Sequence, residues 1–219
     1  MKAIILAAGK GMRMRPLTIK TPKFLLKVGG KPIADYIFEA LPDEVTDVVV
    51  VIKYLGDKIK KHLGNRYYGR RIRYVSGSSR GTAYSLLAAK KLILKNERFF
   101  IIHGDELPGK SKMRQCLDYE FSWLCRYVTD PSQSGVALVS PRGRILKVVE
   151  KPDRYLSNLA VSGVMLVNTT LFKYKPMRHK NGEYFLTSMM SQFVKEHAVY
   201  TVVDKPDIFF NSPADIDRF

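Results

Sequence analysis

The chain has 219 residues, of which 46% are hydrophobic, and its formal net charge is +17. This length and composition suffice for one folded domain and exclude a globally disordered chain. No apolar run approaches the roughly 20 residues of a transmembrane helix, so we expect a soluble, cytoplasmic protein without a membrane partner. The positive charge is spread along the chain without the aromatic spacing of a nucleic-acid module, which disfavours nucleic acid as a partner.

The first half of the chain alternates Val- and Ile-rich runs with segments of helical periodicity. Strands are predicted over residues 2–7, 47–53, 71–75 and 98–103, and helices over 33–41, 55–63 and 82–94. Gly64 follows the second of these helices and predicts its C-terminal end. Such alternation is typical of βαβ units, which build a mostly parallel sheet with helices on its faces.

The pattern changes after Gly104, where shorter strands alternate as in antiparallel sheets. Strands are predicted over 121–127, 135–140, 145–150, 161–167 and 199–203, with a helix over 184–196. No linker separates the halves. We therefore expect one α/β domain over residues 1–219, with a Rossmann-like mixed, mostly parallel sheet flanked by helices and a small antiparallel lobe.

The loop after the first predicted strand combines glycine with positive charge in the string LAAGKGMR, residues 6–13. Gly9 and Gly11 allow backbone N–H groups to turn toward an anion, and Arg13 and Lys23 add charge, which predicts a triphosphate-binding loop. A Walker A loop needs Gly-Lys-Ser/Thr and a dinucleotide fingerprint needs a third glycine that opens a helix, and neither fits. From this loop alone, a glycine turn with chance positive charge stays open.

The longer string LAAGKGMRMRPLTIKTPK, residues 6–23, followed by VGGKP at 28–32, closely resembles the signature of the sugar-phosphate nucleotidyltransferase family. That family includes hexose 1-phosphate uridylyl-, thymidylyl- and guanylyltransferases and related cytidylyltransferases. Further family segments follow in the same order: Gly81-Thr82-Ala83, Gly104-Asp105, Gly135-Val136, Glu150-Lys151-Pro152, Ser162-Gly163 and Gly182-Glu183-Tyr184. The resemblance covers nearly the whole chain.

The resemblance implies a glycosyltransferase-A-like nucleotidyltransferase fold. It also implies that the chain transfers a nucleoside monophosphate from an NTP to a sugar 1-phosphate and releases pyrophosphate, by Mg²⁺-assisted in-line attack of the acceptor phosphate on the α-phosphorus. The acceptor phosphate is already an anion at neutral pH, so the reaction needs no general base. Residues 1–110 are expected mainly to bind the nucleotide and residues 111–219 mainly to bind the acceptor.

The same resemblance implies roles for particular residues. Lys23 is expected to bind the α-phosphate, Arg13 the leaving β- and γ-phosphates, and Asp105 the Mg²⁺ ion, and these three are the expected catalytic residues. The residues expected at the nucleotide are Leu6, Ala7, Ala8, Gly9, Gly11, Arg13, Lys23, Gly81 and Thr82. Those expected at the acceptor are Gly135, Glu150, Lys151, which would hold its phosphate, Gly163 and Glu183.

The chain departs from the family pattern at two places. Many members carry a base-reading glutamine shortly before Gly-Thr-Ala, whereas residues 75–80 read VSGSSR, which leaves Arg80 and Ser76 as candidates. Many members also carry a second metal aspartate near the C-terminus. Here Asn211 is the predicted second ligand of Mg²⁺, the alternatives are Asp204 and Asp207, and Glu106 could assist or replace Asp105.

Other functions stay open from the sequence. The same chemistry could act on phosphocholine, inositol phosphate, cobinamide phosphate or a molybdenum pterin. A glycosyltransferase of similar fold would normally show an Asp-x-Asp motif, which Asp105-Glu106 does not provide. A non-catalytic nucleotide-binding protein is disfavoured because Arg13, Lys23, Asp105 and Lys151 are all present. The base, the acceptor and the oligomeric state, a homo-oligomer included, are undetermined.

Overall fold

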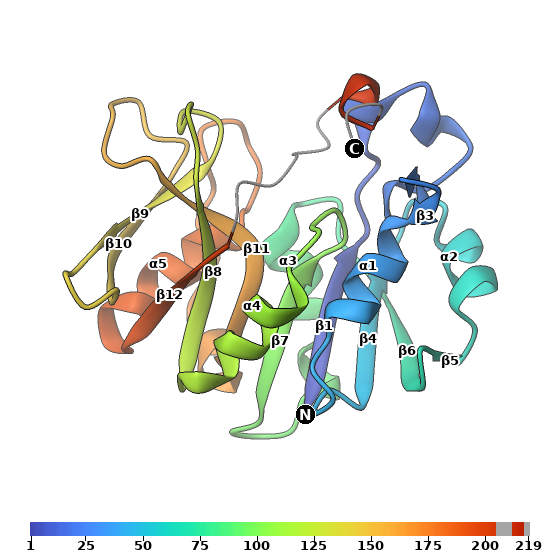
Figure 1. The fold of residues 1–219 in the computed structure, drawn as a ribbon, viewed down its shortest axis with the longest axis horizontal. Helices are drawn as coiled ribbons and strands as arrows, with labels where there is room; N and C mark the ends of the chain where they lie inside the picture. The colour runs from blue at the N-terminus through green and yellow to red at the C-terminus, as the bar shows by residue number, and fades with distance from the viewer. Residues whose placement is uncertain (205–211, 217–219) are drawn as a thin grey trace.

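The computed structural model describes residues 1–204 and 212–216 (Figure 1). Its main sheet has ten strands in the described part of the chain, in the order β10-β9-β11-β7-β1-β4-β6-β5, with β8 paired to β11 and β12 paired to β8. The parallel strands of the first half lie on the right of Figure 1, and the antiparallel strands of the second half lie on the left. One sheet therefore runs through both halves.

Parallel strands form the centre of the first half of the chain, and β1 lies between β4 and β7. Ile4 of β1 is opposite Val49 of β4 and Ile101 of β7, and all three side chains are buried. Continuous Val and Ile runs suit such strands because both faces of the sheet are covered. Their bounds are Lys2–Ala7 for β1, Asp47–Ile52 for β4, Arg70–Ser76 for β6 and Arg98–His103 for β7.

Helices cover both faces of the sheet. Figure 1 shows α1 and α4 in front of it and α3 and α5 behind it. Phe38 of α1 and Met113 of α4 belong to one buried cluster, and Leu86 of α3 and Phe193 of α5 belong to the other. The helices are α1 (Ile33–Ala40), α2 (Gly56–Leu63), α3 (Thr82–Ala88), α4 (Lys110–Gln115) and α5 (Thr187–Glu196).

The second half is built around the long strand β11, which is antiparallel to β7 and to β8. Trp123 of β8 is buried, and its indole N–H donates a 2.8 Å hydrogen bond to the carbonyl of Ser162 on β11. The strands of this half are β8 (Phe121–Tyr127), β9 (Gly135–Val139), β10 (Ile145–Glu150), β11 (Leu159–Asn168) and β12 (Val199–Val203). The remaining short strands are β2 (Lys27–Val28), β3 (Lys31–Pro32) and β5 (Arg66–Tyr67).

The predicted fold class is confirmed, and most predicted elements are within one or two residues of the observed ones. The predicted helix over 82–94 is too long, because α3 ends at Ala88 and a 3₁₀ turn follows at Lys90–Leu92. The predicted helix over 184–196 starts too early, because the main chain of Tyr184 bonds to the loop before α3 and α5 begins only at Thr187. Within the described residues, no helix has the length and apolar composition to cross a membrane.

A buried ion pair joins the end of β7 to the antiparallel half. The carboxylate of Glu106 pairs with the guanidinium of Arg126 on β8, and their side chains are only 11% and 3% exposed. The other oxygen of Glu106 accepts a 2.7 Å hydrogen bond from the backbone N–H of Gly163 on β11. Glu106 therefore connects three strands of the sheet.

We expect Glu106→Ala to lower the free energy of unfolding by about 3–5 kcal/mol, because it leaves the buried charge of Arg126 without its carboxylate. Urea denaturation followed by circular dichroism measures this change. Glu120→Ala, at an exposed glutamate, is the control and should change the same quantity by less than about 0.5 kcal/mol. Equal effects of the two substitutions would contradict a stabilising role for the Glu106–Arg126 pair.

Candidate active site

A cavity of about 760 Å³ lies at the carboxyl ends of β1, β4 and β7, where open α/β sheets bind ligands. Its volume is within the roughly 300–1,000 Å³ of small-molecule sites. All the residues predicted to contact the nucleotide line it: Leu6, Ala7, Ala8, Gly9, Gly11, Arg13, Lys23, Gly81 and Thr82. Asp105 lines it as well. Segments far apart in the sequence thus meet in one site.

The loop after β1 is held in place by Thr18. The backbone of Gly11 has φ of +60°, and a Cβ there would lie 2.9 Å from Cγ2 of Thr18. The buried Thr18 hydroxyl donates a 2.8 Å hydrogen bond to the carbonyl of Gly11. The hydroxyl of Tyr54, just after β4, lies 3.0 Å from the Thr18 carbonyl. Glycine is required at position 11 because a side chain would be strained and would displace Thr18.

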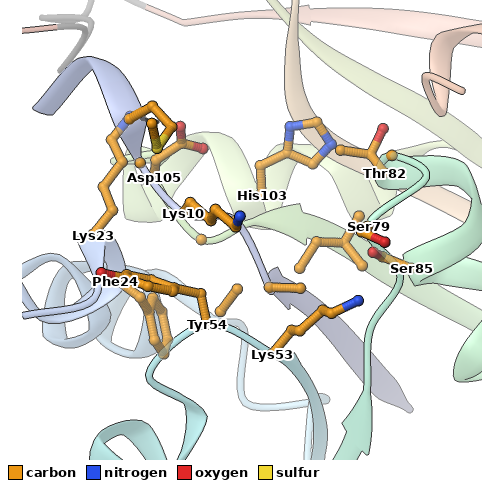
Figure 2. A pocket seen from close by; sticks show the side chains of 18 of the residues that line it. Lys10, Lys23, Phe24, Lys53, Tyr54, Ser79, Thr82, Ser85, His103 and Asp105 are labelled. Carbon is orange, nitrogen blue, oxygen red and sulfur yellow. Dashed lines mark hydrogen bonds and ion pairs between the residues drawn. The ribbon is translucent and has the colours of Figure 1, made fainter. Parts of the chain in front are cut away.

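Lys23 and Asp105 form an ion pair at one end of the cavity (Figure 2). Lys23 Nζ lies 2.7 Å from Asp105 Oδ2, and the two side chains are 16% and 44% exposed. Partial burial alone would raise the pKa of Asp105. The charges of Lys23 and His103, together with hydrogen bonds from Lys23 and the backbone, outweigh burial and lower that pKa below its usual range. The carboxylate is therefore ionised at neutral pH, with Lys23 as its cationic partner.

Arg13 lines the same cavity, is exposed, and makes no hydrogen bond or ion pair with the described residues. Lys10, in the same loop, also lines the cavity. The loop therefore brings positive charge that has no acidic partner in the described part of the chain, together with the flexible backbone of Gly9 and Gly11, to the cavity. This combination suits a ligand with several phosphate groups.

Within the part of the chain that the structure describes, the site does not provide a complete set of metal ligands. No group of three His, Cys, Asp or Glu side chains suited to a metal occurs among the described residues. Glu106, which the sequence left as a possible ligand, is bonded to Arg126 and Gly163 instead. Asp204 accepts a 3.0 Å hydrogen bond from the N–H of Gly109. The other predicted candidates, Asn211 and Asp207, lie outside the described residues.

The predicted acceptor residues are only partly at this cavity. Glu183 lines it from the second half of the chain, and its neighbour Phe185 does too. Lys151 lies near this wall, with Nζ 5.6 Å from the Phe185 ring centre. Gly135 and Glu150 are paired across β9 and β10, and a Cβ at Gly135 would lie 3.2 Å from the Glu150 carboxylate. Neither of these two positions lines the cavity.

Gly163, also predicted at the acceptor, packs behind the cavity wall. A Cβ at this position would lie 2.5 Å from Cβ and Cγ of His103. Only glycine therefore allows β11 to pack this closely against the His103 side chain. His103 itself lines the cavity. Its Nε2 atom is buried and has no hydrogen-bond partner among the described residues. The sequence analysis did not single out His103, although it ends the same strand that precedes Asp105.

The loop before α3 is fixed by the second half of the chain. Gly81 has φ of +127°, and a Cβ there would lie 2.5 Å from the Tyr184 carbonyl. The Tyr184 N–H donates to the Arg80 carbonyl at 2.9 Å, and the Tyr184 carbonyl accepts from the Ala83 N–H at 3.0 Å. The Thr82 hydroxyl accepts a 2.8 Å hydrogen bond from the N–H of Leu186. We call this set of bonds the Gly81–Tyr184 contact.

The two candidates proposed for base reading are not placed at this cavity. The Arg80 guanidinium lies over the ring of Tyr84, 3.7 Å from its centre, and 4.9 Å from that of Tyr184. Ser76 lines a second, smaller cavity. The large cavity is instead lined near α3 by serines and by one lysine that the sequence analysis did not identify: Ser78, Ser79, Ser85 and Lys53.

Replacing Lys23 with methionine should raise the pKa of Asp105, because burial remains while the attraction of the ammonium group is lost. A ¹³C NMR titration of the Asp105 carboxyl measures this pKa. The ion pair lowers the pKa of Asp105 in the folded state below its value in the unfolded chain. It therefore stabilises the wild-type fold at pH values above the unfolded-state pKa, and this stabilisation is lost as the pH falls through the folded-state pKa. Lys10→Met, at the other lysine of the loop, is the control, and an Asp105 pKa that shifts equally in both variants would contradict the assignment.

Comparisons with known proteins agree with this geometry. The solved structure of a putative glucose-1-phosphate thymidylyltransferase from Bacillus anthracis superposes with a TM-score of 0.83 at 25% identity, covering 100% of this chain and 93% of that one. UTP–glucose-1-phosphate uridylyltransferase AglF of Haloferax volcanii is 32% identical over 206 residues, which cover 89% of this chain and 84% of AglF.

The bifunctional protein GlmU of Methanocaldococcus jannaschii is 31% identical over 202 residues. The matched region covers 91% of this chain and 48% of GlmU, so the chain spans about half the length of that relative. The sequence model of the family described as nucleotidyl transferase matches residues 2–208. The chain therefore belongs to the nucleotidyl transferase family.

Proposed function

We propose that this protein transfers a nucleoside monophosphate from an NTP to a sugar 1-phosphate, giving a nucleoside diphosphate sugar and pyrophosphate. The observation that carries the proposal is the pairing of Lys23 with Asp105 beside the glycine loop, in one cavity with the exposed guanidinium of Arg13. Relatives named for uridylyl and thymidylyl transfer to glucose 1-phosphate support the choice of acceptor. Both substrates are cytoplasmic metabolites, so we place the activity in the cytoplasm.

The residues of the cavity can align and neutralise the reacting phosphates. An oxygen of the acceptor phosphate attacks the α-phosphorus, the bond from this phosphorus to the β-phosphate oxygen breaks, and pyrophosphate leaves. Lys23 neutralises the charge that builds on the α-phosphate, and Arg13 with the N–H groups of the glycine loop holds the leaving pyrophosphate. The acceptor approaches from the wall of Glu183 and Phe185, where Lys151 can bind its phosphate.

The donors present fit Mg²⁺ bound together with the nucleotide. Mg²⁺ is usually held by one or two carboxylates, with phosphate oxygens and water completing the shell. Asp105 supplies an ionised carboxylate at the cavity, and the described residues supply no all-protein cage. When bound, the ion would neutralise phosphate charge. In the protein alone, Lys23 occupies the Asp105 carboxylate, so the metal ion and Lys23 compete for it.

Lys23→Ala should lower kcat at least about 100-fold, because one positively charged group at the transferred phosphate is removed. Pyrophosphate release is measured with Mg²⁺, each NTP, and sugar 1-phosphates, phosphocholine and inositol phosphate as acceptors. Lys27→Ala, at an exposed lysine of β2, is the control and should keep wild-type activity. If the wild type released pyrophosphate only with phosphocholine or inositol phosphate, that compound and not a sugar 1-phosphate would be the acceptor. Absence of release with every pair would contradict the proposed reaction.

Removal of divalent cations should abolish the activity, and added Mg²⁺ should restore it. Asp105→Asn should lower kcat by about 100-fold or more and raise the Mg²⁺ concentration for half-maximal rate, because a neutral amide oxygen binds the ion more weakly than a carboxylate. Mg²⁺ titrations of the initial rate in both proteins measure this shift. Asp118→Asn is the exposed control. An unchanged Mg²⁺ dependence in Asp105→Asn would exclude Asp105 as a metal ligand.

A further inference from the structure

The cavity has two chemically different ends, which Figure 2 shows plainly. Lys23 and Asp105 lie at one end, and Ser79 and Ser85 lie at the other. The first end has the charges that phosphates need. The second end, beside the start of α3, is lined by small hydroxyl side chains and suits the polar edge of a flat, uncharged base. The inference below rests on the proposed function, in which the nucleotide spans both ends.

Lys53 points its ammonium group toward the serine end of this cavity (Figure 2). It follows β4 directly, so its backbone is fixed by the sheet, and the Lys53 carbonyl accepts a 3.3 Å hydrogen bond from the N–H of Gly56. Its side chain is exposed and makes no hydrogen bond or ion pair with the described residues. A lysine in this position is available to a ligand.

The serine wall opposite Lys53 is held by hydrogen bonds and by close packing. Ser85 Oγ lies 3.1 Å from the N–H of Ser78, from which it accepts, and 3.2 Å from the carbonyl of Ser78, to which it donates. A Cβ at Gly77 would lie 2.6 Å from Cβ of Ala8, so this wall packs directly against the loop after β1. Ser79 is exposed and has no partner among the described residues. Its hydroxyl can therefore either donate to a base or accept from one.

From the loop before α3, no long polar side chain of the described residues lines this cavity. Arg80 is directed onto the rings of Tyr84 and Tyr184 and does not line the cavity. Lys10 belongs to the loop after β1 and lies between the two ends in Figure 2. Lys53 is thus placed to reach the edge of a base bound against the serine wall.

We propose that Lys53 is the base-reading residue and that it selects bases with an oxo group at the edge facing it, as in uracil, thymine and guanine. The ammonium group has three donors and no acceptor. It can donate to a carbonyl oxygen, but opposite the amino group of cytosine or adenine a donor would face a donor, and both would lose their hydrogen bonds to water. Ser79 can accept from the adjacent ring N–H of the oxo bases.

Direct binding tests this proposal without relying on turnover. Isothermal titration calorimetry with Mg²⁺ gives Kd for UTP, dTTP, GTP, CTP and ATP. For the wild type, the best oxo nucleotide should bind at least about tenfold more tightly than CTP and ATP, as expected when an unmatched donor is left in the complex. Lys53→Met keeps the length of the side chain and removes its hydrogen-bond donors. In this variant, the Kd values of the oxo nucleotides and of CTP and ATP should differ by less than about threefold. Lys53→Glu, which offers only acceptors, should shift the ratio toward CTP and ATP.

Two control lysines separate base reading from loss of charge. Lys10→Met removes the same charge from the same cavity and should weaken all nucleotides by a common factor, leaving the ratio unchanged. Lys61→Met, at an exposed lysine of α2 that does not line the cavity, should change no Kd. The proposal would be overturned if Lys53→Met left the ratio of Kd values between oxo and amino nucleotides unchanged. An equal loss of affinity for every nucleotide, as expected for Lys10→Met, would be such a result. Tightest binding of CTP or ATP by the wild type would also overturn it.

Failure of the proposed function gives a different result. If no acceptor supported pyrophosphate release but the oxo preference disappeared in Lys53→Met, the transfer reaction would be wrong and base reading by Lys53 would stand. If transfer occurred but the preference survived in Lys53→Met, only the role of Lys53 would be lost. Absence of binding by every nucleotide would overturn both.

Discussion

The ion pair between Lys23 and Asp105 is the interaction on which the rest of the site depends. It joins the loop after β1 to the end of β7 and places a cation and an anion 2.7 Å apart in a cavity that otherwise carries excess positive charge. In the proposed reaction, a divalent cation would bind Asp105 fully only once Lys23 moved away, and a triphosphate would offer Lys23 an alternative anion. Metal ion and nucleotide would then favour each other's binding, because each would remove the partner that the other must displace.

The central strands of the fold could be predicted because their sequences are buried on both faces. The run Val48–Val51 has no polar residue, and the predicted strand over 98–103 agrees with β7. The start of α5 could not be predicted, because Tyr184 bonds to Arg80 and Ala83, about 100 positions earlier, and local periodicity carries no such information. The short α4 buries only Met113 and so leaves no periodic pattern.

The end of the candidate site with Lys23 and Asp105 was predictable, whereas at the other end the sequence located Gly81 and Thr82 but neither the serines nor Lys53. Arg13, Lys23 and Asp105 belong to motifs with fixed spacing, and the structure brings them to one cavity. Glu106 follows Asp105 directly, yet its partner Arg126 belongs to another strand, so only the fold shows that Glu106 is not available to a metal ion. Lys53 could have been found by the strand-end rule that located Asp105, since it follows β4 as Asp105 follows β7.

The Gly81–Tyr184 contact has a consequence for the relative position of two walls of the cavity. Tyr184 lies between Glu183 and Phe185, so the segment that fixes the loop before α3 also forms the proposed acceptor wall. Because these hydrogen bonds are present in the protein alone, the loop and the wall are preorganised together, and neither has to be ordered when a ligand binds. In the proposed reaction, the nucleotide and the acceptor would therefore meet walls whose relative position one set of hydrogen bonds fixes.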